Sequence, residues 1–454
     1  MLTLGIDSST QGVKAVVWNG KTKKVDFSAS VGYGRDLPRY GAPNGFLPNG
    51  DPLVRHADPH MWIDGINLLL ARLRATGCPM EQIAAIGGDA QQHATVYLES
   101  LDPLRFSRPT SPIWMDSSTA SWCRMLDRQF GERLRQDTGS PAVERFAGPQ
   151  IMKFARTQPE AYEKTRRIDL LSSFLASYLT GTEMPVDTGD GAGMNLLNLK
   201  TGEWDSEICE AVAPGLAGKL PAVISPDRLG FSRGLDPKFS RFGLRPGTPV
   251  VPFTGDNPAS LLGCFAETPG VAVISLGTSD VFFAAMDTFH TDPEGYGHVF
   301  GNPVGGFFSL SCFKNGSLAR DRVREELGVS WKFFDETAFQ QTPKGNGGKR
   351  AYPYFETEIT PRHDATGIEA NFDWAAAAPE TRIRALVEGQ LANMRERTRW
   401  IGAFDSIIVT GGASVSQGIR EAIGDIFGAR VRSVDSHQAA AVGAARLAAY
   451  ACYV

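Results

Sequence analysis

The chain of 454 residues is long enough for two or three domains, each with a buried core of its own. Its 46 basic and 50 acidic residues give a formal net charge of -4, which lacks the basic excess typical of proteins that bind nucleic-acid phosphates. Its 6 cysteines are far apart and form no Cys-x-x-Cys pair, so their spacing predicts neither a zinc site nor a disulfide framework.

The first residues already have the pattern of a strand, without the basic segment and long apolar run of a signal peptide. No stretch approaches the roughly 18 consecutive apolar residues of a membrane span. Unpaired cysteines fit a reducing compartment. We therefore predict a cytoplasmic protein that binds neither membranes nor nucleic acids.

The chain opens with two short apolar stretches around a polar turn. Leu2–Ile6 and Val13–Trp18 flank a turn rich in small polar residues, which predicts a β-hairpin. Thr10 and Gln11 stand at its tip. Such a tip offers backbone N–H groups and hydroxyls to an anion, although the same pattern also fits an ordinary hairpin.

A second hairpin of this kind is predicted far downstream. Val271–Leu276 and Val281–Ala285 flank a turn that contains Gly277 and Thr278. The repeat suggests a chain of two similar halves. Two such tips facing each other would hold the phosphates of one nucleotide, and the chain contains no G-x-x-x-x-G-K-[ST] phosphate loop that would serve instead.

Helices and strands alternate after each hairpin, which is typical of α/β proteins. The predicted elements are helices at Met61–Leu73, Thr381–Trp400, from near Ser416 and at Ala439–Ala449, and strands at Ile83–Ile86, Ser406–Val409 and Val431–Val434. The connecting region 213–248 is rich in Pro and Gly, so we place a domain boundary at its end. The predicted domains are 1–248 and 249–454.

The segment Pro252–Ser260 holds the leading candidate for a catalytic side chain. Asp256 and Asn257 follow Gly255 at a predicted strand-to-helix junction. Phosphoryl transfer to an alcohol needs a carboxylate that accepts the hydroxyl proton, and an adjacent carboxamide can orient a neighbouring hydroxyl. The same segment also suits a helix cap, with Pro258 in the first turn.

Other segments carry side chains suited to a polyol or a nucleotide. His93 follows two glutamines at a predicted strand end, where open α/β sheets place their ligands. Arg145 could donate to a sugar oxygen, although most arginines are solvated surface charges. Gly411 and Gly412, between a strand and a helix, would let a flat nucleobase lie close to the backbone.

In their order along the chain, these segments resemble the FGGY carbohydrate kinases, and among them the eukaryotic branch that acts on D-xylulose. The resemblance covers nearly the whole chain. The segments that carry it are Gly5–Gln11, Gln91–His93, Ile113–Ser118, Glu144–Phe146, Asp190–Asn195, Phe253–Ser260, Ser275–Ser279, Cys312–Ser317 and Thr410–Ser414. Each is weak or moderate alone, but their common order is specific.

The resemblance implies an α/β fold of two actin-like, ribonuclease-H-like domains with an active-site cleft between them. It implies ATP and Mg²⁺, with phosphoryl transfer to the 5-hydroxyl of D-xylulose, and it suggests a homodimer. By motif position the implied site residues are Asp256 as general base; His93, Arg145, Asp256 and Asn257 for the sugar; Asp7 for Mg²⁺; and Thr10, Gln11, Gly277, Thr278, Trp331, Gly411, Gly412, Ala413 and Ser416 for the nucleotide. Ser416 stands where related chains tend to carry Asn.

Three alternatives stay open at the level of the sequence. The nearest is a kinase of the same family for another polyol, such as ribulose, glycerol, gluconate or an L-sugar. The others are a non-catalytic, actin-like nucleotide-binding module and a sugar-binding protein without turnover. His93 and Arg145 speak against the module, and Asp256 with both hairpin tips speaks against simple sugar binding.

Overall fold

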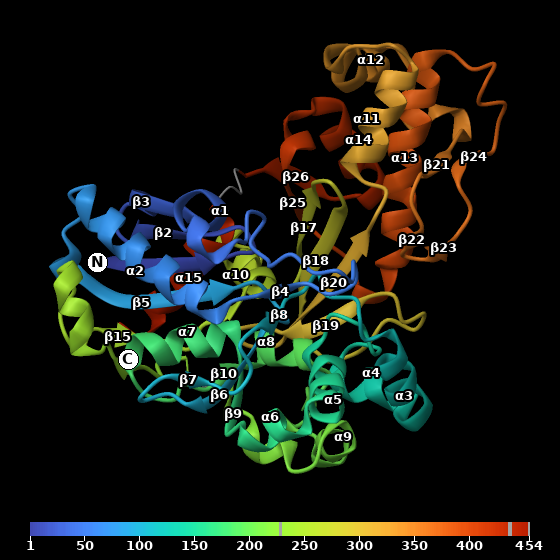
Figure 1. Cartoon of the computed structure of the whole chain (residues 1–454). Coiled ribbons are helices and arrows are strands. Elements are labelled where there is room, and N and C mark those ends of the chain that lie inside the picture. Colours follow the sequence, from blue (N-terminus) through green and yellow to red (C-terminus); the bar gives the residue numbers. More distant parts are fainter. Residues whose placement is uncertain (227–228, 435–437, 453–454) are drawn as a thin grey trace.

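Two mixed β-sheets, one in each lobe, organise the chain (Figure 1). The structure, a computed structural model, describes residues 1–226, 229–434 and 438–452. The first lobe contains the blue and green part of the chain, and the second contains most of the yellow, orange and red part.

The first sheet has 7 strands, ordered β14-β15-β5-β1-β2-β3, with β16 also paired to β5. Strands β1, β2 and β3 are antiparallel, whereas β5 runs parallel to β1 and β15 runs parallel to β5. The bounds are β1 (Leu2–Ser8), β2 (Gly12–Asn19), β3 (Lys24–Gly32), β5 (Ile83–Ala90), β14 (Arg233–Gly234), β15 (Pro249–Val250) and β16 (Thr254–Gly255).

The second sheet has 6 strands, ordered β19-β20-β18-β17-β25-β26. Strands β17, β18, β20 and β19 are successively antiparallel, whereas β25 runs parallel to β17 and β26 runs parallel to β25. The bounds are β17 (Val271–Leu276), β18 (Asp280–Met286), β19 (His298–Gly301), β20 (Phe307–Phe313), β25 (Ser406–Thr410) and β26 (Arg430–Ser433).

Both sheets therefore share one plan, in which three adjacent antiparallel strands (β1-β2-β3 and β17-β18-β20) are joined by two parallel strands beside the first of them, and β19 extends the second sheet. This is the ribonuclease-H-like arrangement expected from the sequence, and it occurs twice. Both predicted hairpins are confirmed, as β1–β2 and β17–β18. Their apolar residues alternate between two covered faces, which favours strands over turns.

Helices cover the sheets and build the outer parts of both lobes. Their bounds are α1 (Tyr33–Asp36), α2 (Pro59–Ala75), α3 (Ala120–Phe130), α4 (Glu132–Thr138), α5 (Ala147–Thr157), α6 (Pro159–Lys164), α7 (Leu171–Thr180), α8 (Thr188–Gly191), α9 (Ser206–Val212), α10 (Asp256–Gly263), α11 (Ser317–Glu326), α12 (Ala338–Gln341), α13 (Pro379–Arg397), α14 (Gln417–Phe427) and α15 (Ala439–Tyr450). None of the described helices is both long and apolar enough to cross a membrane.

Shorter strands complete the structure in small sheets of two or three strands. Their bounds are β4 (His56–Ala57), β6 (Thr95–Ser100), β7 (Arg105–Phe106), β8 (Ser111–Pro112), β9 (Arg167–Leu170), β10 (Val186–Asp187), β11 (Leu197–Asn198), β12 (Glu203–Trp204), β13 (Val223–Ile224), β21 (Ala351–Tyr354), β22 (Glu358–Ile359), β23 (Arg362–His363) and β24 (Gly367–Ala370).

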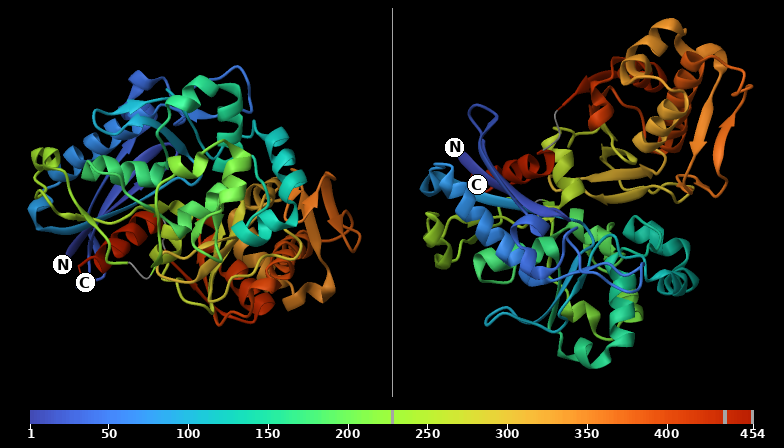
Figure 2. Two further views of the ribbon diagram at one scale, coloured as in Figure 1. Left: turned by 90° about the horizontal axis from the view of Figure 1, so that it is seen from below. Right: turned by 45° about the horizontal axis from the view of Figure 1, so that its top comes forward.

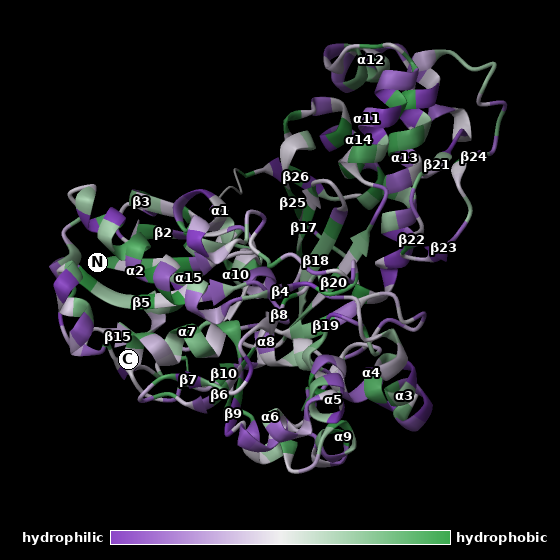
Figure 3. Ribbon diagram, viewed as in Figure 1, coloured by the Kyte–Doolittle hydropathy of each residue, from purple (hydrophilic) through white to green (hydrophobic). Residues whose placement is uncertain are grey.

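Each large sheet has its own hydrophobic core, as Figure 3 shows by the green strands at the centre of each lobe. In the first lobe, Trp62 and Leu69 of α2 and Phe174 of α7 are fully buried against the sheet. Asp58 caps the start of α2 by accepting a hydrogen bond from the N–H of His60. The predicted amphipathic helix is therefore confirmed.

Helix α15 returns from the end of the chain to the first sheet, close to β1 (Figure 2). Glycines permit this approach: a Cβ on Gly5 would lie 1.9 Å from the carbonyl oxygen of Ala441, and one on Gly87 would lie 2.2 Å from that of Ala444. The predicted packing of this helix on a sheet is confirmed, although the sheet belongs to the other half. The domain boundary at residue 248 stays a prediction, and β15 and β16, which follow it, also belong to the first sheet.

Candidate active site

Three carboxylates lie close together at strand ends of the first sheet. Asp7 on β1 is paired in register with Asp89 on the parallel strand β5, so their side chains point to the same face. Thr254 on β16 is paired with Asp89 on the other side, and α10 begins two residues later at Asp256. Burial, and then the charges of Asp7 and Asp256, raise the pKa of Asp89 well above its usual range.

Asp256 is the first residue of α10 and is partly exposed. The N-cap position belongs to Gly255 and has no side-chain hydrogen bond, so Asp256 is not the cap that the sequence also allowed. Its Oδ1 accepts hydrogen bonds from the backbone N–H and the side-chain Nδ2 of Asn257, at 2.9 and 3.2 Å.

The electrostatic setting of Asp256 suits proton transfer near neutral pH. Burial and the charge of Asp7 raise the pKa of Asp256 to about 7, against the opposing effect of backbone hydrogen bonds from Asn257 and Gln92. A carboxylate with a pKa close to the working pH can accept a proton efficiently in a transition state. Asp256 thus has the accessibility and the basicity that a general base requires.

Asn257 is oriented by its neighbours. Its Nδ2 donates to Oε1 of Gln92 at 2.8 Å, and Nε2 of Gln92 donates to the carbonyl oxygen of Gly189 at 3.4 Å. The bonds of Nδ2 engage the side-chain amide hydrogens of Asn257. They thereby fix the direction in which its carboxamide oxygen points. Because Gln92 immediately precedes His93, the same loop links Asn257 to the next candidate for the sugar.

His93 has a defined tautomer. Its Nδ1 lies 2.9 Å from the carbonyl oxygen of Gly193, and since a carbonyl only accepts, Nδ1 carries the hydrogen and Nε2 is left as an acceptor. The ring stacks on Phe146 with centroids 4.3 Å apart. Burial and the charge of Arg145 hold the pKa of His93 well below its usual range, so the imidazole is neutral.

His93 also occupies an unusual backbone position. Its φ of 70° lies in the left-handed region, which non-glycine residues enter at a cost of about 1–3 kcal/mol. A Cβ on Gly193 would lie 2.8 Å from Nδ1 of His93, so the residue that faces the imidazole at this position must be glycine. Such strain is common where a side chain is held for a ligand.

Arg145 lies beside His93, and its guanidinium N–H groups are available to a ligand. Its guanidinium carbon lies 5.7 Å from the ring centroid of Phe146, and no hydrogen bond or ion pair to Arg145 occurs within the described ranges. Burial lowers its pKa. A desolvated guanidinium without a protein acceptor is well suited to donate to the oxygens of a ligand.

The tip of the first hairpin is tied to neighbouring loops. The hydroxyl of Thr10 donates to Oε1 of Gln91 at 3.2 Å and accepts from Nε1 of Trp114 at 2.8 Å. Gln11 is exposed and accepts a backbone hydrogen bond from Tyr33 through its carbonyl oxygen. The tip is thus held in shape, and its role in phosphate binding stays a prediction.

The tip of the second hairpin adjoins the glycine pair of the second lobe. Gly411 has a φ of 86°, and a Cβ there would lie 2.3 Å from the carbonyl oxygen of Leu276, which immediately precedes Gly277 and Thr278. Only glycine fits this position. A Cβ on Gly412 would meet nothing within 4 Å, so this side of the turn is open.

The residues predicted to hold the adenosine lie around the start of α14. Ser416 caps α14 by accepting from the N–H of Ile419 at 3.3 Å, and its hydroxyl donates to the carbonyl oxygen of Asp335, also at 3.3 Å. The helical segment that contains Asp335 begins with Trp331, which is 45% exposed. Ala413 belongs to the short turn that precedes Ser416.

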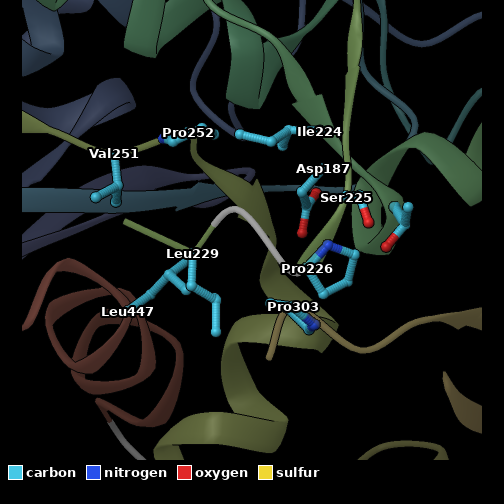
Figure 4. A pocket seen from close by; sticks show the side chains of 10 residues that line it. Asp187, Ile224, Ser225, Pro226, Leu229, Val251, Pro252, Pro303 and Leu447 are labelled. Atoms are coloured by element: carbon cyan, nitrogen blue, oxygen red, sulfur yellow. The ribbon is translucent and has the colours of Figure 1, made fainter. Parts of the chain in front are cut away.

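A small pocket is lined by residues of the first lobe, by Pro303 of the second and by Leu447 of α15 (Figure 4). Its single carboxylate is that of Asp187, which accepts from the hydroxyl of Thr254 at 2.6 Å and from the N–H of Asp190 at 2.9 Å. Both oxygens of Asp187 are therefore occupied. The remaining lining is mostly apolar, which distinguishes this pocket from the carboxylates around Asp256.

Two family models together match nearly all of the chain. Residues 2–263 match the N-terminal domain of the FGGY family of carbohydrate kinases, and residues 272–452 match its C-terminal domain. The chain belongs to the FGGY family of carbohydrate kinases. This FGGY kinase is therefore a phosphotransferase, of a family for which ATP is the substrate that supplies the phosphoryl group.

Curated relatives of this FGGY kinase match over most of their length. A protein of Rattus norvegicus named xylulose kinase is 38% identical over 97% of this chain and 87% of its own. Xylulose kinase 2 of Arabidopsis thaliana is 36% identical over 99% of this chain and 87% of its own. The chain is thus similar to both across its two lobes.

Solved structures share the fold of this FGGY kinase. The xylulose kinase of Bifidobacterium adolescentis is 25% identical, with a TM-score of 0.83 over 100% of this chain and 93% of the other. The glycerol kinase of Plasmodium falciparum with ADP is 16% identical, with a TM-score of 0.84 over 99% and 89%. The predicted fold of two actin-like domains is confirmed.

The sequence alone did not single out several polar residues of this site. Asp89 was part of a polar segment, but only its register with Asp7 reveals where its carboxylate lies. Gln92 orients Asn257. His298, on β19 of the second lobe, lies near Arg145, and burial together with the charge of Arg145 lowers the pKa of His298 to about 3. No local pattern marks His298, because its neighbours come from the other half of the chain.

Proposed function

We propose that this FGGY kinase transfers the γ-phosphoryl group of ATP to D-xylulose and forms D-xylulose 5-phosphate. The observation that carries the proposal is the partly exposed carboxylate of Asp256, with a pKa of about 7, which is linked through Gln92 to the loop that carries the neutral imidazole of His93. The identity of the sugar is inferred from the rat and Arabidopsis relatives, which are named xylulose kinases and match over nearly the whole chain.

In the proposed mechanism, Asp256 accepts the proton of the attacking hydroxyl as its oxygen bonds to phosphorus. His93 accepts a hydrogen bond from a second hydroxyl through Nε2, Arg145 donates to a sugar oxygen, and Asn257 fixes the hydroxyl next to the attacking one. These contacts hold the acceptor in line with the phosphoryl group, and such positioning accounts for much of the catalysis of phosphoryl transfer.

The residues present fit a divalent cation beside Asp7. Asp7 is a carboxyl group at a strand end; it is hydrogen-bonded to the side chain of Asp89 and lies 3.5 Å from Nζ of Lys14. Oxygen ligands of this kind suit Mg²⁺, which usually keeps several of its waters. Asp7 would hold the ion through water, and Mg²⁺ when bound supplies positive charge to the phosphates.

The hairpin tips are proposed to hold the phosphates of ATP. Thr10 and Gln11 of the first lobe, with Gly277 and Thr278 of the second, would offer N–H groups and hydroxyls to these phosphates. Gly411, Gly412, Ala413 and Ser416 would line the adenosine. Since the hydroxyl of Ser416 is already engaged by the backbone, we expect this position to shape the pocket rather than to bond the nucleotide.

Replacement of Trp331 by Ala is expected to raise KM for ATP by about 10-fold and to leave KM for the sugar unchanged. Stacking of an aromatic side chain on a nucleobase is worth about 1–3 kcal/mol, and Trp331 is half exposed on the proposed adenosine side. Steady-state kinetics with each substrate varied in turn measure both constants. The control is Trp374→Ala in the same lobe, where no nucleotide contact is proposed; equal effects of the two variants would contradict this role for Trp331.

A panel of acceptors tests the proposed substrate. ADP release should be fastest, as kcat/KM, with D-xylulose, and slower with D-ribulose, glycerol, D-gluconate and L-xylulose. A higher value for another polyol would favour a different kinase of the same family. ADP release that no acceptor increases would favour a nucleotide-binding module instead. A cytoplasmic location stays a prediction drawn from the sequence, and a homodimer stays one drawn from the family resemblance.

A further inference from the structure

His298 is a polar side chain of the second lobe that the proposed mechanism does not use. Its imidazole is 9% exposed, and its Nδ1 lies 3.0 Å from Oγ of Ser140. Within the described ranges Nε2 has no hydrogen-bond partner, yet it is not one of the unpartnered atoms that are sealed from solvent. The imidazole is therefore nine-tenths buried, with one nitrogen left accessible to a ligand.

The strand that carries His298 is fastened to the first lobe. The backbone N–H of Val299 donates to the carbonyl oxygen of Gly139 at 2.9 Å. Gly139 has a φ of 84°, and a Cβ there would lie 2.2 Å from the carbonyl oxygen of Val299, so only glycine fits this contact. His298 thus has a fixed position against the first lobe, although β19 belongs to the second sheet.

His298 faces the same buried aromatic ring as His93. The ring centroid of Phe146 lies 5.6 Å from that of His298 and 4.3 Å from that of His93. The charge of Arg145 lowers the pKa of both imidazoles, so both are neutral. Phe300, on the same face of β19 as His298, also packs near Phe146, at 6.5 Å. Two neutral imidazoles and one guanidinium therefore surround this ring.

The other end of β19 lies close to the segment that leads to Asp256. A Cβ on Gly189 would lie 3.1 Å from the carbonyl oxygen of Gly301 and 3.0 Å from the hydroxyl of Thr254, which precedes Asp256 by two residues. His298 precedes Gly301 by three residues, or roughly 10 Å of strand. His298 therefore belongs to the part of the cleft that would hold the end of the sugar remote from the attacking hydroxyl.

The two groups at this remote end differ in the hydrogen bonds that they can form. The guanidinium of Arg145 only donates, so it suits an oxygen that only accepts, such as the carbonyl of a ketose. The hydroxyl of Ser140 can donate to Nδ1 of His298 or accept from it, so Nε2 can present either a lone pair or a hydrogen. A sugar hydroxyl both donates and accepts, and it therefore matches His298 in either tautomer.

We propose that His298 is a specificity-determining residue for the acceptor, whose Nε2 forms a hydrogen bond with the 1-hydroxyl of D-xylulose. The inference rests on the proposed function, because phosphorylation of the 5-hydroxyl decides which end of the sugar reaches His298. His93, Arg145 and Asn257 already have proposed partners among the other oxygens. The second lobe thus contributes a side chain of its own to the recognition of the sugar.

The test compares D-xylulose with 1-deoxy-D-xylulose, which lacks the 1-hydroxyl, in wild type and in His298→Leu. For wild type we expect kcat/KM to be about 10-fold higher with D-xylulose, as for one hydrogen bond. His298→Leu should remove this preference: kcat/KM should fall about 10-fold with D-xylulose, and by less than about twofold with the deoxy sugar. Such a double difference isolates the contact between the side chain and the hydroxyl.

Two further variants serve as controls. His298→Gln carries an amide close to the position of Nε2, so it should retain most of the preference for D-xylulose. His363→Leu is the matched control, because His363 of β23 is in the same lobe and packs on Tyr354 at 3.9 Å, where no sugar contact is proposed. It should keep the preference of wild type. If His298→Leu does not fold, His298→Phe is also apolar and suits the aromatic neighbours, and the same measurements apply.

Each outcome decides a different point. If wild type phosphorylates both sugars equally well, or if His298→Leu lowers kcat/KM equally with both, the inference about His298 is overturned and the proposed kinase stands. Equal losses with both sugars would give His298 a purely structural role. If wild type transfers no phosphoryl group to D-xylulose, the proposed function itself fails.

Discussion

Replacement of Asp256 by Asn should lower kcat of sugar phosphorylation by about 10²–10⁴-fold, which is the usual contribution of a general base. The substitution keeps the size of the side chain but removes the group that accepts the proton. Asp256 is partly exposed, and burial raises its pKa to about 7, so its loss removes a base tuned to neutral pH. ADP release with D-xylulose measures the change.

The fold should survive this substitution. The N-cap of α10 is Gly255, and Asp256 accepts hydrogen bonds from Asn257 and from the backbone of Gln92, for which Asn keeps a carboxamide oxygen as acceptor. Asp205→Asn is the matched control, because Asp205 caps α9 through two N–H groups and Asn caps a helix equally well. If Asp256→Asn kept the kcat of wild type, the base would have to be another group.

The second large effect is expected at Gly443, where α15 crosses α10. A Cβ there would lie 1.8 Å from the carbonyl oxygen of Ala259 and 2.9 Å from the backbone nitrogen of Gly263. Gly443→Ala must therefore push α10 and α15 apart, at a cost of about 2–3 kcal/mol in the free energy of unfolding. Since α10 begins with Asp256, a shift of about 1 Å should also lower kcat, by about 100-fold.

Gly424→Ala in α14 provides the matched control for this prediction. A Cβ on Gly424 would meet its neighbours at 3.5 and 3.6 Å, which is ordinary contact. In the interior of a helix, Ala is favoured over Gly by about 0.5–1 kcal/mol, so this variant should be slightly more stable than wild type. Denaturant unfolding compares the two, and equal stability of both variants would contradict the close packing of α10 on α15.

Much of the fold could be predicted from local patterns. The alternation of apolar residues and polar turns predicted both hairpins, and their repetition predicted two related halves. The helix expected at Met61–Leu73 extends only two residues further at each end, because Asp58 and Pro59 set its start. Such features depend on residues that are close in sequence, where capping and periodicity act.

The remaining features depend on contacts between distant segments. The register of β1 with β5 places Asp89 beside Asp7, and parallel register cannot be read from either strand alone. His298, from the other lobe, lies close enough to Arg145 for the charge of Arg145 to lower the pKa of His298. Ser416, which the family resemblance assigns to the nucleotide, is a similar case, since its hydroxyl caps α14 and also bonds to Asp335 of a distant segment.

The return of α15 to the first sheet also has a consequence for biosynthesis. The glycines of β1 and β5 leave room for α15, which comes from the far end of the chain and places Ala441 against Gly5. While the ribosome is still extending the chain, that face of the sheet has no cover. That face of the first lobe therefore stays uncovered until α15 has emerged, and an uncovered sheet face of this kind is prone to aggregation during folding.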